Sequence, residues 1–259
     1  MSVRLILSLD FDGTSYEDEA LPPVHPELPP LLRAWRERGA VWVVNTGRSV
    51  SHTLEGLVRG RFGLAPDFLI TRERDIMVRN PVGRWIDFGS WNARCEEEHD
   101  KLFRRVRKVL KEVRRFIEKE TAGSYLEMPE EPAGVVASSL EEMERVVDFV
   151  DPLIAEIPDL RYERNSIYLR FSHAGFTKGT ALAHLSRSLG LGPPGVFSAG
   201  DNYNDLPMLD PSVAGHIACP GNALPGVRRA VEAAGGFCAP GRASLGTAEA
   251  LRWLAARLA

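Results

Sequence analysis

Short apolar runs that end in polar residues recur near the start of the sequence. Residues 4–9, 40–44 and 68–71 are predominantly apolar runs of four to six residues, which is typical of buried strands. Between them, residues 31–39 and 49–59 carry apolar residues at helical spacing, and the first of these segments ends at a glycine. This alternation of strand and helix predicts parallel βαβ units and an α/β sheet.

A different pattern lies between residues 73 and 173. Apolar and polar residues alternate around Gly83, as in a β-hairpin. Two amphipathic helices and two stretches of β structure are expected further on, at residues 99–120, 140–154, 134–137 and 161–171. This order predicts a separate α+β module with an antiparallel sheet.

The α/β rhythm returns after residue 174. A helix, a strand, a short helix and a further strand are expected at residues 178–189, 195–199, 206–209 and 214–218. We therefore expect an α/β fold with a Rossmann-like parallel sheet. Its core is built from residues 1–72 and 174–259, and an α+β domain is inserted at residues 73–173.

Composition and charge narrow the class of protein. The chain has 259 residues, of which 44% are hydrophobic and 26% charged, as is usual for a soluble globular protein. A formal net charge of -3 gives no basic field, so neither nucleic acid nor a membrane is the expected partner. The charged residues of the expected helix at 99–120 are most simply a solvated face. No apolar stretch approaches the roughly 20 residues that span a bilayer.

The cysteines indicate a reducing compartment. Cys95, Cys219 and Cys238 are odd in number and show no spacing typical of a zinc site. A disulfide framework is therefore not expected, and we expect a cytoplasmic protein.

Polar residues follow several of the predicted strands. Asp10 and Asp12 come directly after the first strand, Thr46 follows the second, and Asp201 follows the strand at 195–199. In a parallel sheet these strand ends share one edge, where ligands bind. Carboxylates crowded there repel one another unless a cation compensates them. Oxygen ligands without a neighbouring His or Cys favour Mg²⁺ over zinc.

Four short motifs, in a fixed order along the chain, resemble those of a known protein family. They are DFDGT at 10–14, VVNTGR at 43–48, FTKGTAL at 176–182 and GDNYNDLPML at 200–209. With these motifs the sequence resembles the haloacid dehalogenase (HAD) superfamily of phosphotransferases. Only 36 residues separate Asp10 from Thr46, and the large insertion lies between the second and third motifs. This placement resembles the type II branch (subclass IIB), in which an α+β cap domain is inserted, as in Cof-like and sucrose-phosphate phosphatases.

The resemblance implies roles for Asp10, Asp12 and Lys178 in catalysis. Asp10 would attack phosphorus to give an aspartyl-phosphate, and Asp12 would protonate the leaving alcohol and then activate water. Lys178 would bind the phosphoryl group and stabilise the charge of Asp10.

Binding roles are implied for further residues of the motifs. Thr46, Gly47, Arg48, Lys178 and Asn204 would contact the phosphate or the substrate. Mg²⁺ would be held by Asp201, by an Asp10 oxygen and by the Asp12 backbone carbonyl. Asp205 and Asn204 would complete the metal shell, or orient its waters and Lys178.

Ordinary structural roles stand beside these readings. Asp12 with Gly13 alone would suit a turn, Thr46 would suit a helix cap, and Lys178 a solvated helix start. A polar loop would explain GDNYND, and a surface salt bridge explains Arg48 as well as substrate binding does.

The insertion supplies the candidates for substrate selection. Arg164, Asn165, Ser166 and Tyr168 are candidates to face the substrate, although an ordinary β surface would also explain them. One departure from the branch follows the third strand. An Asn-Gly-Ala-like turn is common there, whereas this chain reads Thr-Arg-Glu-Arg-Asp at 71–75.

The sequence thus predicts a cytoplasmic, Mg²⁺-dependent phosphomonoesterase, a hydrolase of small phosphate esters and above all of sugar phosphates. A sugar phosphomutase is the alternative enzyme, since Arg161, Arg164 and Arg170 could hold a bisphosphate. A non-catalytic module that binds phosphate esters is the alternative outside enzymes. The sequence carries no prediction of oligomeric state.

Overall fold

The computed structural model describes residues 4–128 and 131–259. The chain divides into two compact units, Met1–Asn92 with Thr177–Ala259, and Ala93–Phe176. Each unit has its own sheet and its own cluster of buried hydrophobic residues.

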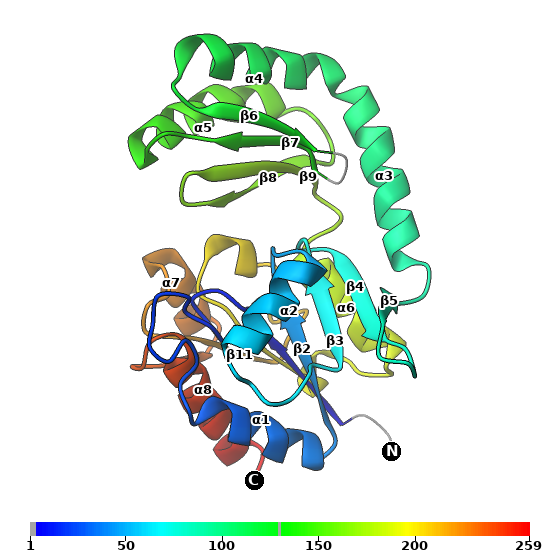
Figure 1. Ribbon diagram of the computed structural model, residues 1–259, viewed down its shortest axis with the longest axis vertical. Coiled ribbons are helices and arrows are strands. Elements are labelled where there is room, and N and C mark those ends of the chain that lie inside the picture. The colour runs from blue at the N-terminus through cyan, green and yellow to red at the C-terminus, as the bar shows by residue number, and fades with distance from the viewer. Residues whose placement is uncertain (1–3, 129–130) are drawn as a thin grey trace. The chain divides into compact units, whose positions relative to one another are not determined.

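In the described chain, eight strands form the sheet of the first unit, in the order β12-β11-β10-β1-β2-β3-β4-β5 (Figure 1). They are β1 (Leu5–Leu9), β2 (Ala40–Asn45), β3 (Phe68–Thr71), β4 (Asp75–Arg79), β5 (Trp85–Asp87), β10 (Val196–Ala199), β11 (His216–Cys219) and β12 (Phe237–Cys238). All pairs from β12 to β3 are parallel. The predicted α/β fold with a parallel central sheet is confirmed.

The order of the strands explains where a site should lie. From β1 the chain runs outward through β2 and β3 on one side, and it later returns to β10 on the other side. The connections therefore diverge between β1 and β10. The crevice at the carboxyl ends of such diverging strands is the usual ligand site of an open α/β sheet.

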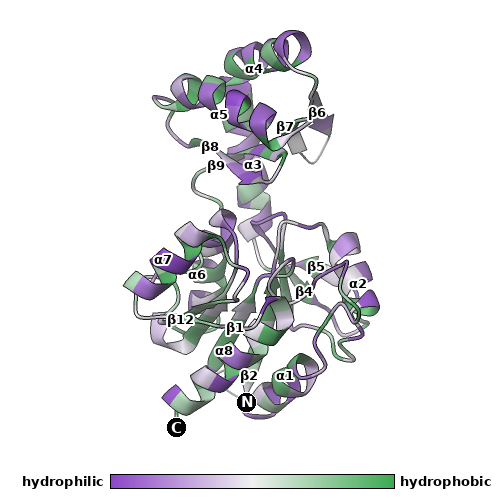
Figure 2. Cartoon of the chain, turned by 90° about the vertical axis from the view of Figure 1, so that its left-hand side faces the viewer, coloured by the Kyte–Doolittle hydropathy of each residue, from purple (hydrophilic) through white to green (hydrophobic). Residues whose placement is uncertain are grey.

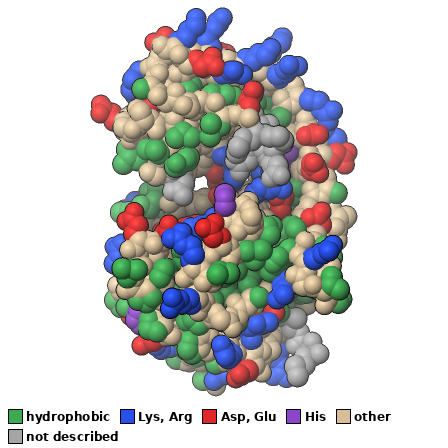
Figure 3. Space-filling view, in the orientation of Figure 1, with side chains coloured by type: hydrophobic (Ala, Val, Ile, Leu, Met, Phe, Trp, Pro, Cys, Tyr) green, Lys and Arg blue, Asp and Glu red, His purple; other side chains and the backbone are tan. Residues whose placement is uncertain are grey.

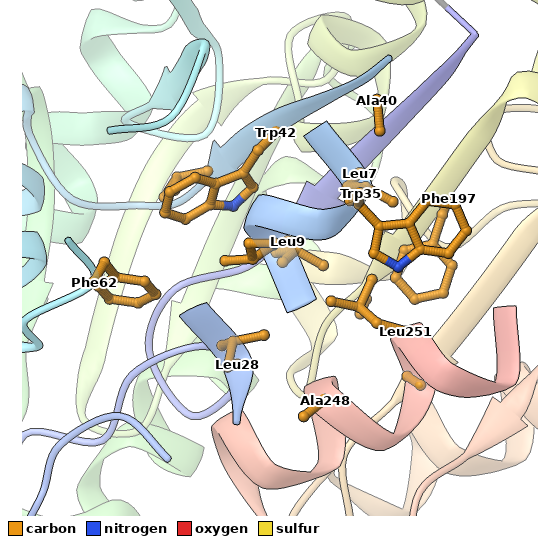
Figure 4. Packing of buried hydrophobic residues seen from close by; sticks show 14 of the residues in the cluster. Leu7, Leu9, Leu28, Trp35, Ala40, Trp42, Phe62, Phe197, Ala248 and Leu251 are labelled. Atoms are coloured by element: carbon orange, nitrogen blue, oxygen red, sulfur yellow. The ribbon is translucent and has the colours of Figure 1, made fainter. Parts of the chain in front are cut away.

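Helices cover both faces of this sheet. They are α1 (Leu28–Glu37), α2 (Val50–Arg59), α6 (Lys178–Ser188), α7 (Pro225–Ala233) and α8 (Ala243–Arg257), with short 3-10 turns η1 (Pro193–Gly195) and η2 (Tyr203–Asp205). Helices α1, α2 and α8 share one buried cluster with β1, β2 and β10. In Figure 4, Trp35 of α1 and Leu251 of α8 lie beside Phe197 of β10. Because both faces are covered, every residue of β1 is buried, which accounts for its apolar sequence.

The hairpin of β4 and β5 belongs to the sheet of the first unit and not, as predicted, to the inserted domain. We expected residues from 73 onward to belong to the inserted domain, but β4 pairs antiparallel with β3 from Phe68–Val78 to Thr71–Asp75. The alternating pattern is thus that of an edge hairpin of the large sheet. The first unit extends to Asn92, and the second ends at Phe176 rather than at residue 173.

The second unit has an antiparallel sheet in the order β6-β7-β9-β8. Its elements are α3 (Trp91–Arg105), which begins in the first unit, α4 (Arg107–Glu120), β6 (Ser124–Met128), β7 (Glu131–Val136), α5 (Leu140–Ile154), β8 (Leu160–Asn165) and β9 (Tyr168–His173). The helix expected at 99–120 is divided at Val106, where the backbone leaves helical geometry. Helix α5 has the predicted bounds, and the Ser139 side chain caps it by accepting a hydrogen bond from the Glu142 N–H.

Hydropathy follows this packing. Hydrophilic and hydrophobic residues alternate along α4 and α5 (Figure 2), as expected of helices that cover a sheet with one face. The Lys and Arg side chains of α4 reach the surface at the top of Figure 3. Within the described ranges, no helix combines the length and apolarity that crossing a membrane requires.

Candidate active site

The residues of the first, second and fourth motifs follow three neighbouring strands. Asp10 follows β1, Thr46 follows β2, and Asp201 stands two positions after the end of β10. These strands lie in the order β10-β1-β2, so their carboxyl ends are adjacent. The backbone N–H of Asp10 donates to the Ala199 carbonyl at 2.9 Å, which joins the first and fourth motifs directly.

The third motif contributes Lys178 to the site from the start of α6. The Thr177 side chain caps this helix in a reciprocal capping box with Thr180, so Lys178 is its first residue. The Lys178 side chain is 1% exposed, and its Nζ donates to Asp10 Oδ1 and to Asp205 Oδ1, both at 2.6 Å. Burial alone lowers the pKa of Lys178, but Asp10 and Asp205 outweigh it and hold that pKa above its ordinary value. Lys178 is therefore a buried cation and not a solvated helix-start lysine.

Three carboxylates gather beside this lysine. Asp10, Asp201 and Asp205 each place an oxygen within 4.8 Å of the others. Burial is the largest cause that raises the pKa of Asp10 and of Asp201, and repulsion from Asp205 is the second. The pKa of Asp201 rises to about 7. Oxygen donors whose negative charges are crowded in this way fit a hard divalent cation, which would relieve the repulsion.

The loop at residues 13–14 packs closely against the Asp201 side chain. Gly13 has a φ of +73°, and a Cβ on it would lie 2.5 Å from Asp201 Oδ2, so the backbone here requires glycine. The Thr14 hydroxyl donates to Asp201 Oδ1 at 2.9 Å. The Asn222 amide donates to the Gly13 carbonyl at 2.8 Å and to Asp201 Oδ2 at 3.4 Å.

Asp205 has a different environment from Asp201. Its Oδ2 accepts the backbone N–H groups of Asp201 and Asn202, both at 2.9 Å, while Oδ1 accepts from Lys178. This fully buried carboxylate therefore holds the loop after β10 in shape and fixes Lys178. Both of its oxygens accept hydrogen bonds from the protein, and direct ligation of a metal by Asp205 stays a prediction.

Asp12 and Arg48 form a pair at the edge of the site. The Asp12 side chain is 48% exposed. Arg48 donates two hydrogen bonds to this carboxylate, from Nε to Oδ2 at 2.8 Å and from a terminal nitrogen to Oδ1 at 2.6 Å. The guanidinium also lies 5.1 Å from the ring centre of Phe11 and 5.3 Å from that of Tyr16. In this structure Arg48 thus pairs with Asp12, and a salt bridge was one of the two roles that the sequence left open for it beside substrate binding.

The loop after β2 lies against the end of β3. Thr46 is 1% exposed, and its hydroxyl accepts the Arg48 N–H at 3.1 Å. Glu73 donates its backbone N–H to the Thr46 carbonyl at 3.0 Å. A Cβ on Gly47 would lie 3.0 Å from Glu73 Oε1, and Asn204 donates to the same oxygen at 2.9 Å.

Sequence reasoning missed Glu73 and Asn222, and it gave Thr14 no role. Thr14 was detectable, since it belongs to the DFDGT motif. Asn222 stands three residues after β11, the next strand end along the sheet, which was the available signal. Glu73 carries no spacing signal at all.

The candidates in the inserted domain lie at the turn between β8 and β9. Arg164 is paired with Glu144 at 2.6 Å, Ser166 has a φ of +54°, and the Tyr168 side chain is exposed. The side chain of Asn165 lies outside the described part of the structure. That these residues face the substrate stays a prediction.

An all-oxygen carboxylate cluster with a buried lysine, at the carboxyl edge of a parallel sheet, defines a class of α/β enzymes that use a divalent cation. Residues 68–234 match the sequence profile of the haloacid dehalogenase-like hydrolases. The chain belongs to this family, and the resemblance carried by the four motifs is confirmed.

Similar proteins include phosphatases. A stretch of 91 residues is 32% identical to a phosphoglycolate phosphatase of Methanothrix thermoacetophila, and it covers 35% of this chain and 34% of that protein. The match thus spans about a third of that relative.

Solved structures share the fold over nearly the whole chain. The sucrose-phosphatase of Synechocystis, solved with sucrose and phosphate, has a TM-score of 0.70 at 18% identity and covers 98% of both chains. A haloacid dehalogenase-like hydrolase of Bacteroides thetaiotaomicron has a TM-score of 0.67 at 18% identity, covering 96% of this chain and 99% of that one. These likenesses show the fold of the branch with the inserted α+β domain.

Proposed function

We propose that this chain is a Mg²⁺-dependent phosphomonoesterase that cleaves small phosphorylated metabolites of the sugar phosphate class through an aspartyl-phosphate at Asp10. One observation carries the proposal. The buried Asp10–Lys178 ion pair lies beside Asp201 at the point where the strand connections diverge. That is where a nucleophile, a countercharge and cation ligands must meet.

In the first step, a carboxylate oxygen of Asp10 forms a bond to phosphorus while the bond from phosphorus to the leaving-group oxygen breaks. Asp12 gives its proton to that oxygen. In the second step, Asp12 takes a proton from water, whose oxygen attacks phosphorus and releases Asp10 and inorganic phosphate. Lys178 holds one Asp10 oxygen at 2.6 Å and so orients the other for attack.

Arg48 positions Asp12 at the edge of the site. A carboxylate that accepts a bond on each oxygen carries no proton, so the pair suits the proton uptake of the second step, and one of its two bonds must open when Asp12 carries the proton of the first step. The bidentate pair fixes the carboxylate plane, and the contacts with Phe11 and Tyr16 fix the guanidinium. The Thr46 hydroxyl, the Gly47 N–H and Lys178 bind the phosphoryl oxygens in this proposal.

Asp10, Asp201 and the backbone carbonyl of Asp12 would hold the cation, with Asp205 acting through Lys178 and the loop after β10. When bound, Mg²⁺ reduces the repulsion between the Asp10 carboxylate and the phosphate. The crowded carboxylates and their raised pKa values support such an ion.

The substrate class rests on the branch of the family. Its sucrose-phosphatase member was solved with sucrose and phosphate. Arg161 and Arg164, which a phosphomutase would need for a second phosphate, are paired with Glu163 and Glu144. A cytoplasmic location belongs to this proposal, because the three cysteines are odd in number and show no spacing typical of a disulfide framework or a zinc site.

The test is hydrolysis of p-nitrophenyl phosphate and of a panel of sugar phosphates, with Mg²⁺ and with EDTA. We expect metal-dependent release of phosphate that Asp10→Asn abolishes. Asp210→Asn, which changes an exposed carboxylate after the fourth motif, is the matched control and should keep wild-type rates. Interconversion of sugar phosphates without phosphate release would indicate a mutase. Binding without turnover would indicate a non-catalytic module.

A further inference from the structure

Glu73 is a buried carboxylate that lies outside the four motifs. It follows β3 in left-handed backbone geometry with a φ of +67°, and Arg72 before it has a φ of +50°. Two successive residues in this region turn the chain sharply, and the Glu73 N–H secures the turn by donating to the Thr46 carbonyl. The side chain, 7% exposed, is thereby brought to the carboxyl edge of the sheet.

Glu73 connects two loops of the site. Its Oε1 accepts a hydrogen bond from the Asn204 Nδ2 at 2.9 Å. The same oxygen lies beside Gly47, where the missing Cβ leaves it room. A side chain from the turn after β3 thus holds the loop after β10 against the loop after β2.

The charge of Glu73 determines which way the Asn204 amide faces. An ionised carboxylate only accepts hydrogen bonds, so it selects the NH₂ end of the amide. The carbonyl oxygen of Asn204 must then face away from Glu73. A neutral partner such as glutamine can both donate and accept, and it would lose this selection.

The carbonyl oxygen of Asn204 lacks a hydrogen-bond donor among the described residues. This Oδ1 is buried and accepts no hydrogen bond from any described residue. A buried acceptor without a donor costs about 1–3 kcal/mol, so a donor from outside is expected. A phosphate dianion has no hydrogen to give, whereas a water molecule on a cation and a sugar hydroxyl do. Asn204 stands between Asp201 and Asp205, both in the carboxylate cluster, and Mg²⁺ usually keeps several waters.

We propose that Glu73 is a positioning residue that turns the carbonyl oxygen of Asn204 toward a water held by the divalent cation. The inference rests on the proposed function, because it requires a hydrated cation in the carboxylate cluster. The sequence analysis gave Asn204 two roles, in phosphate binding and in the surroundings of the metal, and this inference favours the second.

The test is a double-mutant cycle read by calorimetric titration of Mg²⁺ into metal-free protein. Glu73→Gln and Asn204→Ala should each weaken Mg²⁺ binding roughly tenfold. The double variant should be no weaker than either single one, since Glu73 acts through Asn204. Losses that multiply in the double variant would show that Glu73 acts through its charge alone, and they would overturn the proposal.

Two further variants separate position from charge and from folding. Glu73→Asp keeps the charge but withdraws the oxygen, so it should weaken Mg²⁺ binding as Glu73→Gln does. Asp75→Asn removes a buried carboxylate of the same turn that pairs with Arg72, and it should change Mg²⁺ affinity less than about twofold. Wild-type affinity in Glu73→Asp contradicts the proposal. Melting temperatures identify any variant that fails to fold.

The substrate hydroxyl is the competing donor, and KM distinguishes it. Unchanged Mg²⁺ affinity in Glu73→Gln together with a raised KM for sugar phosphates would place the hydroxyl at Asn204 and overturn the proposal. If the proposed function itself fails, the wild type neither binds Mg²⁺ nor hydrolyses phosphate esters. If only this inference fails, the wild type does both and the Glu73 variants bind Mg²⁺ normally.

Discussion

Replacing Asp201 with Asn should stabilise the metal-free protein while abolishing turnover. Asp201 shares its surroundings with Asp10 and Asp205, and burial followed by repulsion from Asp205 raises its pKa from 3.8 to about 7. A carboxyl whose pKa rises on folding binds more protons in the folded state, so its contribution to stability falls as the pH rises. The cost is absent below the unfolded value of 3.8 and complete above about 7.

The magnitude follows from that pKa. A rise from 3.8 to about 7 corresponds to roughly 4 kcal/mol at alkaline pH. Asn keeps an oxygen that can accept the hydrogen bond from the Thr14 hydroxyl. Its NH₂ group, however, would face the NH₂ group of Asn222, and this contact between two donors costs about 1–2 kcal/mol. We expect a net gain of about 2–3 kcal/mol, which raises the melting temperature by roughly 5–10 °C.

The assay compares melting of the wild type and Asp201→Asn in EDTA, at about pH 8.5 and at about pH 5.5. Groups far from the site titrate alike in both proteins, so the difference reports position 201 together with Asp10, whose pKa the Asp201 charge helps to raise. That difference should fall to roughly a third or less at the lower pH, because the wild-type carboxyl then takes up a proton while the penalty at Asn222 stays. Added Mg²⁺ should stabilise the wild type far more than the variant. A variant that melts below the wild type at alkaline pH, or a difference independent of pH, would show that the Asp201 charge does not destabilise the metal-free protein.

Two other substitutions test the Asp12 pair and the loop that approaches Asp201. Arg48→Ala should slow hydrolysis of alkyl phosphates roughly a hundredfold but that of p-nitrophenyl phosphate only slightly, because a good leaving group needs little proton donation from Asp12. Equal losses in kcat on both substrates would speak against a role through Asp12. Gly13→Ala should destabilise the protein by about 1–3 kcal/mol and weaken Mg²⁺ binding, since its Cβ would lie 2.5 Å from Asp201 Oδ2 at a φ of +73°. Wild-type melting and calorimetry would show that the loop accommodates the methyl group.

The α/β core was predictable because buried parallel strands carry continuous apolar runs. β3 has the predicted bounds, Phe68–Thr71, and β1 and β2 differ from prediction by one residue each. Because the sheet is parallel, the polar residue after each strand had to lie at one edge. That argument brought Asp10 and Asp201 together before any distance was known.

Tertiary detail was beyond the sequence. Alternation around Gly83 identifies a hairpin but not the sheet that receives it, and here β3 does. The partner of Arg48 was undecided because a flexible side chain on a loop reaches both Asp12 and a substrate. Glu73 is a single charged residue in a turn, and its contact with Asn204 spans 131 positions of sequence.

The proposed aspartyl-phosphate at Asp10 can be tested by locating the phosphoryl group on the protein during turnover. Acid quenching of the Asp12→Asn variant with p-nitrophenyl phosphate and Mg²⁺, followed by peptide mass spectrometry, would trap any covalent intermediate. An aspartyl-phosphate mechanism predicts one phosphoryl group on the peptide that contains Asp10, and none when Asp10 is replaced by Asn. Phosphate release by the wild type with no phosphoryl group ever found on Asp10, or with one found on another residue, would contradict it.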